Sequence, residues 1–163
     1  MKNTSLKNLT QAAVFLALAI AIQWLRLPQL VTGTAINAVL LLAGTLISIR
    51  WGMTIGLITP LVAIAVGIMP PALLFVSFFI ALGNASYIFI FSKIYSKNLK
   101  DKVMAIGLGS LVKFAILAIA SNMILLLPPA VTTMLTFPQI ITAVLGGITA
   151  TLLIPSLEKI KRY

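Results

Sequence analysis

Apolar residues occupy most of the chain in long uninterrupted stretches, and short polar or proline-containing segments separate these stretches. A helix needs about 20 mainly apolar residues to cross the hydrocarbon core of a membrane. The pattern therefore predicts an all-α integral membrane protein, a single transmembrane domain over residues 1–163 with six transmembrane helices. The predicted helices cover residues 9–25, 35–49, 52–69, 72–91, 103–127 and 139–154.

The composition agrees with this prediction. Of 163 residues, 61% are hydrophobic and 9% are charged, whereas a soluble domain carries roughly a quarter charged residues. Most of the surface must therefore face lipid, and we expect no soluble domain. Unbroken apolar runs also differ from the alternating polarity of transmembrane β-strands, which excludes a transmembrane barrel.

The charged residues indicate how the helices are oriented. Twelve Lys and Arg residues stand against Asp101 and Glu158, which gives a net charge of +10. In a soluble protein this balance suggests nucleic-acid binding, but here the basic residues lie in short connections, so we expect no nucleic-acid partner. With six spans, one side of the membrane holds ten basic residues and the other holds only Arg26, while Lys113 lies within a span. Because basic connections remain in the cytoplasm, both termini are predicted to be cytoplasmic.

The connections predicted on the outer side contain proline and threonine and carry almost no charge. They cover residues 26–34, 69–72 and 127–139. The first and the last of them are long enough to act as lids over a molecule bound from outside.

Lys113 is the most informative polar residue, because it lies near the middle of a predicted span. A lysine at that depth costs about 2.5–3.5 kcal/mol on insertion scales. One interpretation is structural: Lys113 extends to the inner interface or bonds to carbonyl groups. The other is a cationic contact with an anionic or acceptor-rich ligand. No predicted span contains a carboxylate that could neutralise the charge, and we therefore favour the ligand.

Several amide side chains also lie within predicted spans or at their outer ends. Such amides often join helices to one another, but Asn37, Asn84 and Gln139 could converge with Lys113 on one cavity that opens outward. We predict these four residues to bind substrate. Asn122 is nine residues from Lys113, about 180° around the helix. It cannot face the same cavity unless that helix is distorted.

The first helix carries Ala13, Ala17 and Ala21 at four-residue spacing. Small residues at this spacing form a smooth ridge that another helix can approach closely. The ridge serves either internal packing or docking of a partner subunit.

Residues that are missing narrow the function further. The chain has no GxxxxGK[ST] loop, so it does not hydrolyse ATP by that route. It has no Cys, no His and no carboxylate within a predicted span, which leaves no metal site and no usual proton-coupling group. We expect neither an enzyme nor a cofactor, and a proton-driven pump is not expected.

Several segments together resemble a known family of small membrane proteins. The stretch from Thr32 to Ala43, the run Arg50-Trp51-Gly52 with Gly56, and the closing Phe137-Pro138-Gln139 with Gly146-Gly147 are similar to the substrate-binding S components of energy-coupling factor (ECF) vitamin transporters. The alanine ridge of the first helix is similar as well. The resemblance covers nearly the whole chain.

This resemblance implies a multi-pass protein of a prokaryotic plasma membrane that captures a vitamin or vitamin precursor from outside. It implies docking through Ala13, Ala17 and Ala21 on a membrane T subunit that two cytoplasmic ATPases drive. Aromatic-rich loops of the thiamine and riboflavin binders are absent, and Lys113 favours an acidic or acceptor-rich molecule such as pantothenate, a pyridoxine relative or a cobalamin precursor such as α-ribazole. The alternative is a small membrane assembly protein that binds no ligand.

Overall fold

Six α-helices with short connections make up the described part of the protein. The structure is a computed structural model that describes residues 2–161, and side chains from 6 to 160. The helices are α1 (Lys2–Trp24), α2 (Gln29–Leu46), α3 (Ile49–Ala65), α4 (Leu74–Ile94), α5 (Leu99–Ile119) and α6 (Pro129–Lys161). A 3₁₀ turn, Pro71–Leu73, precedes α4, and a π-turn, Ala120–Ile124, follows α5. The described residues contain no strand, as predicted.

Five of the helices are long and apolar enough to cross a membrane, namely α1, α2, α4, α5 and α6. The apolar helix α3 is shorter, at 17 residues, and has Pro60 in its interior. A helix of 17 residues lies at the lower limit of what crosses a bilayer. A multi-pass membrane fold is therefore shown, while the predicted count of six spans stays a prediction.

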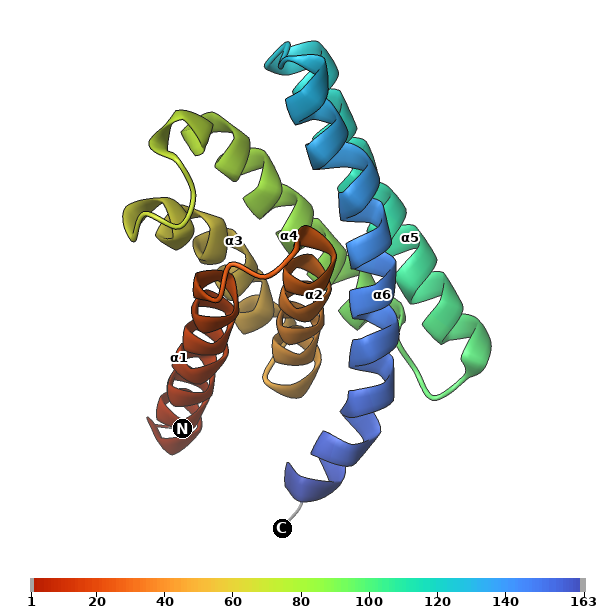
Figure 1. Ribbon diagram of the computed structural model, residues 1–163. Coiled ribbons are helices and arrows are strands. Elements are labelled where there is room, and N and C mark those ends of the chain that lie inside the picture. The colour runs from red at the N-terminus through yellow and green to blue at the C-terminus, as the bar shows by residue number, and fades with distance from the viewer. Residues whose placement is uncertain (1, 162–163) are drawn as a thin grey trace.

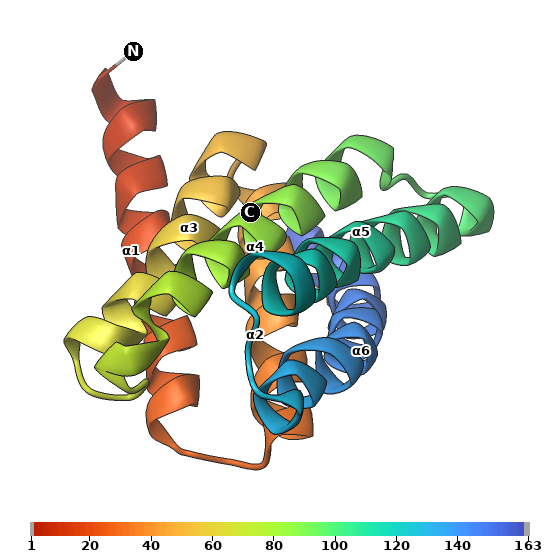
Figure 2. The same cartoon turned by 90° about the horizontal axis from the view of Figure 1, so that it is seen from above.

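Helix α2 occupies the centre of the bundle, and α1 lies at its edge (Figures 1 and 2). Helix α2 packs against α1, α3, α4 and α6, whereas α1 contacts only α2 and α3. The central position of α2 agrees with its burial, because residues Asn37 to Gly44 are all buried. Both ends of the described chain lie at the same end of the bundle (Figure 1).

Glycines bring α6 close enough to α2 to bury polar side chains between them. A Cβ added to Gly33 of α2 would lie 2.8 Å from the Thr142 side chain, and one added to Gly146 of α6 would lie 2.5 Å from the Asn37 side chain. Neither position has room for a side chain. Small residues at a helix contact allow this close approach within a membrane, and here they place Asn37 beside Thr142.

Helices α2 and α6 are longer than predicted at the side that the charge pattern predicts to be outer. Helix α2 begins at Gln29 rather than at residue 35, and α6 begins at Pro129 rather than at residue 139. Both connections predicted to be long enough to act as lids are therefore mostly helical. The prediction of loops at residues 26–34 and 127–139 was wrong for most of their length. The hydroxyl groups of Thr133 and Thr136 donate to the carbonyl groups of Pro129 and Thr132, so these threonines bond within the helix instead of ending it.

The predicted ends of the last helix were also wrong, because they rested on prolines. Pro138 and Pro155 both lie inside α6, although each was expected to be outside a helix. Membrane helices tolerate proline because neighbouring helices and hydroxyl side chains satisfy the freed backbone groups. Helix α3 is instead shorter than predicted and ends at Ala65 rather than at residue 69, where Gly67 adopts a φ of 74°.

Candidate functional site

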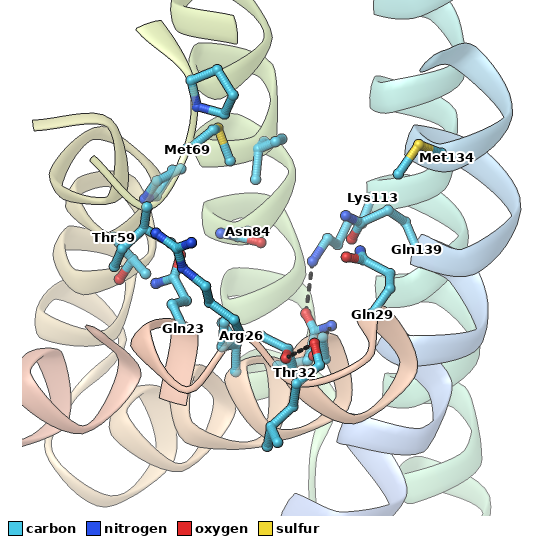
Figure 3. Close-up of a pocket in the computed structure, with 18 residues that line it drawn as sticks. Gln23, Arg26, Gln29, Thr32, Thr59, Met69, Asn84, Lys113, Met134 and Gln139 are labelled. Atoms are coloured by element: carbon cyan, nitrogen blue, oxygen red, sulfur yellow. Dashed lines mark hydrogen bonds between the residues drawn. The ribbon is translucent and has the colours of Figure 1, made fainter. Parts of the chain in front are cut away.

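A cavity of about 490 Å³ lies at the end of the bundle where the α1–α2 and α3–α4 connections meet. All four residues predicted to bind substrate line it: Asn37 from α2, Asn84 from α4, Lys113 from α5 and Gln139 from α6. Figure 3 shows the side chains of Asn84, Lys113 and Gln139 around the cavity. The tertiary structure thus brings together residues that are up to 102 positions apart (139 − 37).

The contact between Lys113 and Asn37 forms the polar centre of the cavity. The Lys113 Nζ donates a hydrogen bond of 2.7 Å to Asn37 Oδ1 (Figure 3). Lys113 is 3% exposed and Asn37 is 2% exposed, so Lys113 does not extend to the membrane interface. The aliphatic part of Lys113 passes Gly83 of α4, where an added Cβ would lie 3.2 Å from Lys113 Cγ.

Helices α2 and α6 hold the Asn37 amide in one orientation. Its Nδ2 donates to the Gly33 carbonyl at 2.8 Å and to Thr142 Oγ1 at 3.5 Å. Thr142 is fully buried and donates to the Gln139 carbonyl at 3.1 Å. Because the nitrogen of the amide is bonded within the protein, its oxygen faces Lys113.

Lys113 keeps hydrogen-bonding capacity for a ligand. An ammonium group has three donors, and in the described part of the chain its one recorded partner is Asn37. The described residues that line the cavity include no Asp and no Glu. The cation is therefore held by a neutral amide and has no neutralising carboxylate beside it.

Asn84 and Gln139, the other two predicted residues, differ in whether a hydrogen bond fixes the side chain. Asn84 Nδ2 donates to the Gly56 carbonyl of α3 at 3.3 Å and so joins α4 to α3. The Gln139 side chain is half-buried, and residues 2–161 show no hydrogen bond to it. Gln139 is thus the freer of the two amides at the cavity.

Sequence reasoning missed five polar residues of the cavity wall, namely Gln23, Arg26, Gln29, Thr32 and Thr59. Arg26 and Gln23 lie on the side of the cavity across from Lys113 and Gln29 (Figure 3). Arg26 adopts a φ of 49°, which is rare for a residue with a side chain and directs the chain into the turn before α2. Its isolation as the one basic residue on the predicted outer side was a signal that could have identified it.

Apolar side chains form the rest of the wall, including Ile36, Ile80 and Met134. The described lining residues include no aromatic side chain. The size of the cavity, its apolar wall and its few convergent polar groups are typical of a small-molecule site. Two cations without a carboxylate favour a ligand that carries negative charge.

Asn122 and the alanine ridge lie outside this cavity. Asn122 is exposed within the π-turn that follows α5, where its amide donates to the Ala118 carbonyl at 2.9 Å. Ala13, Ala17 and Ala21 are exposed on α1, whereas Ala12 and Ala19 pack inward. The described residues contain no cluster of His, Cys, Asp or Glu that could hold a metal ion.

Apolar helices long enough to cross a membrane, with a cavity among them that a few polar side chains line, are the architecture of a multi-pass membrane protein. The family model of the ECF transporter substrate-specific component matches residues 7–158, and the chain therefore belongs to that family. No curated protein and no solved structure matches the chain. The family comprises substrate-binding transporter subunits, which associate with T and ATPase subunits, and it is not an enzyme family.

Proposed function

We propose that this chain captures a small aliphatic acid of the vitamin or vitamin-precursor class and delivers it to an ECF-type ABC importer. Lys113, held by Asn37 and lacking a carboxylate partner among the described residues, is the observation that supports an acid. Asn84 and Gln139, together with Arg26, would bind the polar groups of the ligand away from its carboxylate.

The cavity also distinguishes among the molecules that the family resemblance suggests. Pantothenate carries a carboxylate, an amide and hydroxyl groups on an aliphatic chain, which suits Lys113 and the amide side chains. Pyridoxine and α-ribazole are built on flat aromatic rings and lack a carboxylate. The described wall offers such rings no aromatic partner to stack on. Pantothenate is therefore the ligand that we propose to test first.

Partners and location follow from the same proposal. The subunit would work in the plasma membrane of a prokaryote, with a T subunit and two cytoplasmic ATPases. The exposed ridge of Ala13, Ala17 and Ala21 supports docking through α1, because α1 is the edge helix of the bundle. Family membership favours this role over that of an assembly protein without a ligand.

Calorimetric titration of the detergent-purified protein with pantothenate, pyridoxine and α-ribazole tests the ligand. We expect pantothenate to bind and the two uncharged molecules to bind at least about tenfold more weakly, because they lose a charge-assisted bond to Lys113. Native mass spectrometry of the purified protein would identify any other retained molecule. Tighter binding of an uncharged aromatic molecule would contradict the proposal.

A further inference from the structure

A second cavity, of about 520 Å³, lies at the opposite end of the bundle. The α2–α3 turn, the end of α4 with its connection to α5, and the C-terminal part of α6 surround it. Hydroxyl groups are frequent in its wall and come from Thr45, Ser48, Ser92, Tyr95 and Ser96. None of these residues belongs to the first cavity.

Positive charge dominates this second cavity. Lys97 and Lys102 line it, and Glu158 is the one acidic residue among the described residues of its wall. Ser48 and Ile49, at the N-terminus of α3, line it as well. The N–H groups of a helix N-terminus attract anions, and one of those in α3, the Trp51 N–H, already donates to Ser48 Oγ at 3.4 Å. The other acidic residue nearby, Asp101, accepts hydrogen bonds from Ser96 and Asn98.

One hydroxyl group in the wall lacks a partner. Ser92 Oγ is buried and forms no hydrogen bond within the described part of the chain. It lies beside α2, where a Cβ added to Gly44 would be 2.8 Å from it. Buried polar groups are nearly always bonded to something, so this hydroxyl is an unsatisfied polar group just behind the wall of the cavity.

Two aromatic residues of the kind found at the membrane–water interface lie at or near this cavity. Tyr95 ends α4 at its wall, and the half-buried Trp51 lies in the first turn of α3 close by in sequence. Tyrosine and tryptophan collect at the level where membrane meets water. A basic pocket between helices at the cytoplasmic level binds the headgroups of anionic lipids.

We propose that this second cavity binds the phosphate ester of a phospholipid headgroup, with phosphatidylglycerol as the lipid of matching chemistry. Lys97 and Lys102 bind the phosphate together with the N-terminus of α3. Glu158 accepts hydrogen bonds from the hydroxyl groups of the headgroup glycerol. A single phosphate charge suits this wall, because two lysines face one carboxylate.

Native mass spectrometry tests the proposal on the full chain reconstituted in equal parts of phosphatidylglycerol and phosphatidylcholine. We expect phosphatidylglycerol to stay bound in preference. The double variant Lys97→Gln with Lys102→Gln should lower the bound phosphatidylglycerol at least about tenfold, because two charge-assisted hydrogen bonds are lost.

The variant Lys93→Gln with Lys100→Gln is the matched control. It removes two exposed charges from the same end of the molecule, but neither residue lines the cavity. We expect it to retain phosphatidylglycerol within about twofold of the unchanged protein, because neither side chain lines the cavity and charges outside it act weakly through solvent. Equal loss in both double variants, or no preference for phosphatidylglycerol over phosphatidylcholine, would overturn the proposal. Helix content by circular dichroism confirms that each variant is folded.

Two further experiments test whether the bound phosphate belongs to a lipid and whether Glu158 contacts the headgroup. Adding soluble glycerol 3-phosphate should leave the bound lipid in place, and its displacement would overturn the lipid as occupant in favour of a soluble phosphate ester. Glu158→Gln should weaken retention of phosphatidylglycerol but not of phosphatidic acid, which has no headgroup hydroxyl beyond the phosphate. Equal weakening of both lipids would overturn the contact between Glu158 and the glycerol.

Discussion

At the scale of single residues, the cavity depends on a cation that the protein binds but does not neutralise. Lys113 Nζ lies 2.7 Å from the oxygen of Asn37, which is a neutral acceptor. Burying a cation in this way is costly unless a further partner arrives. The proposed ligand role therefore makes function and stability place opposite demands on Lys113, and this difference can be measured.

Replacing Lys113 by Met keeps the length and apolar packing of the side chain while removing its charge. Charge-assisted hydrogen bonds contribute about 1.5–3 kcal/mol, so we expect the affinity for pantothenate to fall roughly ten- to a hundred-fold in calorimetric titration. The melting temperature should stay unchanged or rise, because removing a costly buried charge offsets the lost bond to Asn37.

Lys100→Met is the control for this experiment, because Lys100 is exposed and lines neither cavity. Lys100→Met should change neither the affinity for pantothenate nor the melting temperature. A purely structural Lys113 gives the reverse result in Lys113→Met, with a lower melting temperature and unchanged affinity in the protein that folds.

Replacing Asn37 by Asp puts a carboxylate next to the Lys113 ammonium group. The new ion pair satisfies Lys113 internally and places negative charge where the ligand carboxylate would bind. We expect the affinity for pantothenate to fall at least about tenfold, as for the loss of one charge-assisted bond. The affinity of the same variant for the uncharged amide analogue of pantothenate should fall much less. Equal losses for the acid and the amide in titrations of the same variant would argue against a carboxylate at this position.

At the scale of elements, α1 differs from the other helices in how little of it the bundle covers. It contacts only α2 and α3, and its alanine ridge faces outward. Ala12 and Ala19 hold the opposite side of α1 against the bundle, where they are 5% and 0% exposed. An edge helix with a smooth outer face leaves room for a second membrane protein to pack closely.

Replacing Ala17 by Trp tests this docking surface. We expect the bulky side chain to block association with the T subunit and to abolish vitamin uptake, because it fills the smooth ridge. Ligand binding by the isolated subunit should stay within about twofold, since surface changes far from a site have small effects. Copurification with tagged T subunit and titration of the isolated protein measure the two effects.

Leu18→Trp provides the matched control, because Leu18 is 46% exposed and lies about 100° around α1 from Ala17. It adds the same side chain to α1 and leaves the alanine ridge open. If Ala17→Trp reduces ligand binding as much as association, the ridge serves internal packing instead.

At the scale of the whole molecule, charge and cavity chemistry divide the bundle into two ends. The proposed substrate cavity lies at one end, with Arg26 as the one basic residue of its connections, and the lysine-lined second cavity lies at the other. Both ends of the described chain lie at the same end of the bundle (Figure 1), an arrangement that an even number of crossings would give. The open question is whether α3, with 17 residues, completes a crossing.

Alkaline phosphatase fusions answer this question, because the enzyme is active only outside the cytoplasm. With six spans and cytoplasmic termini, a fusion after Tyr163 should be inactive and a fusion after Gly67, in the α3–α4 connection, should be active. If α3 does not cross, the two activities exchange: the fusion after Gly67 is inactive and the fusion after Tyr163 is active. Protein levels of both fusions serve as the control for expression.

The sequence by itself determined the helical membrane fold and the polar residues of the proposed substrate cavity. Long apolar runs leave the backbone no alternative to helices in lipid, and a polar residue in such a run stands out because it must find a partner there. For this reason Asn37, Asn84, Lys113 and Gln139 could be identified before their contacts were known. The alanine ridge was readable from spacing alone, although which side of α1 faces outward was not.

Only the tertiary structure decided which polar groups meet and where the helices begin. Gln29 and Thr32 were assigned to a loop, and residues 129–138 were assigned to another, because threonine and proline normally mark a connection. Within the bundle, hydroxyl-to-backbone bonds and helix packing override that local preference. The bond from Lys113 to Asn37 spans 76 positions and depends on glycines that let α6 approach α2 and α5 approach α4. Such a contact arises from the packing of whole helices, which no local pattern in the chain encodes.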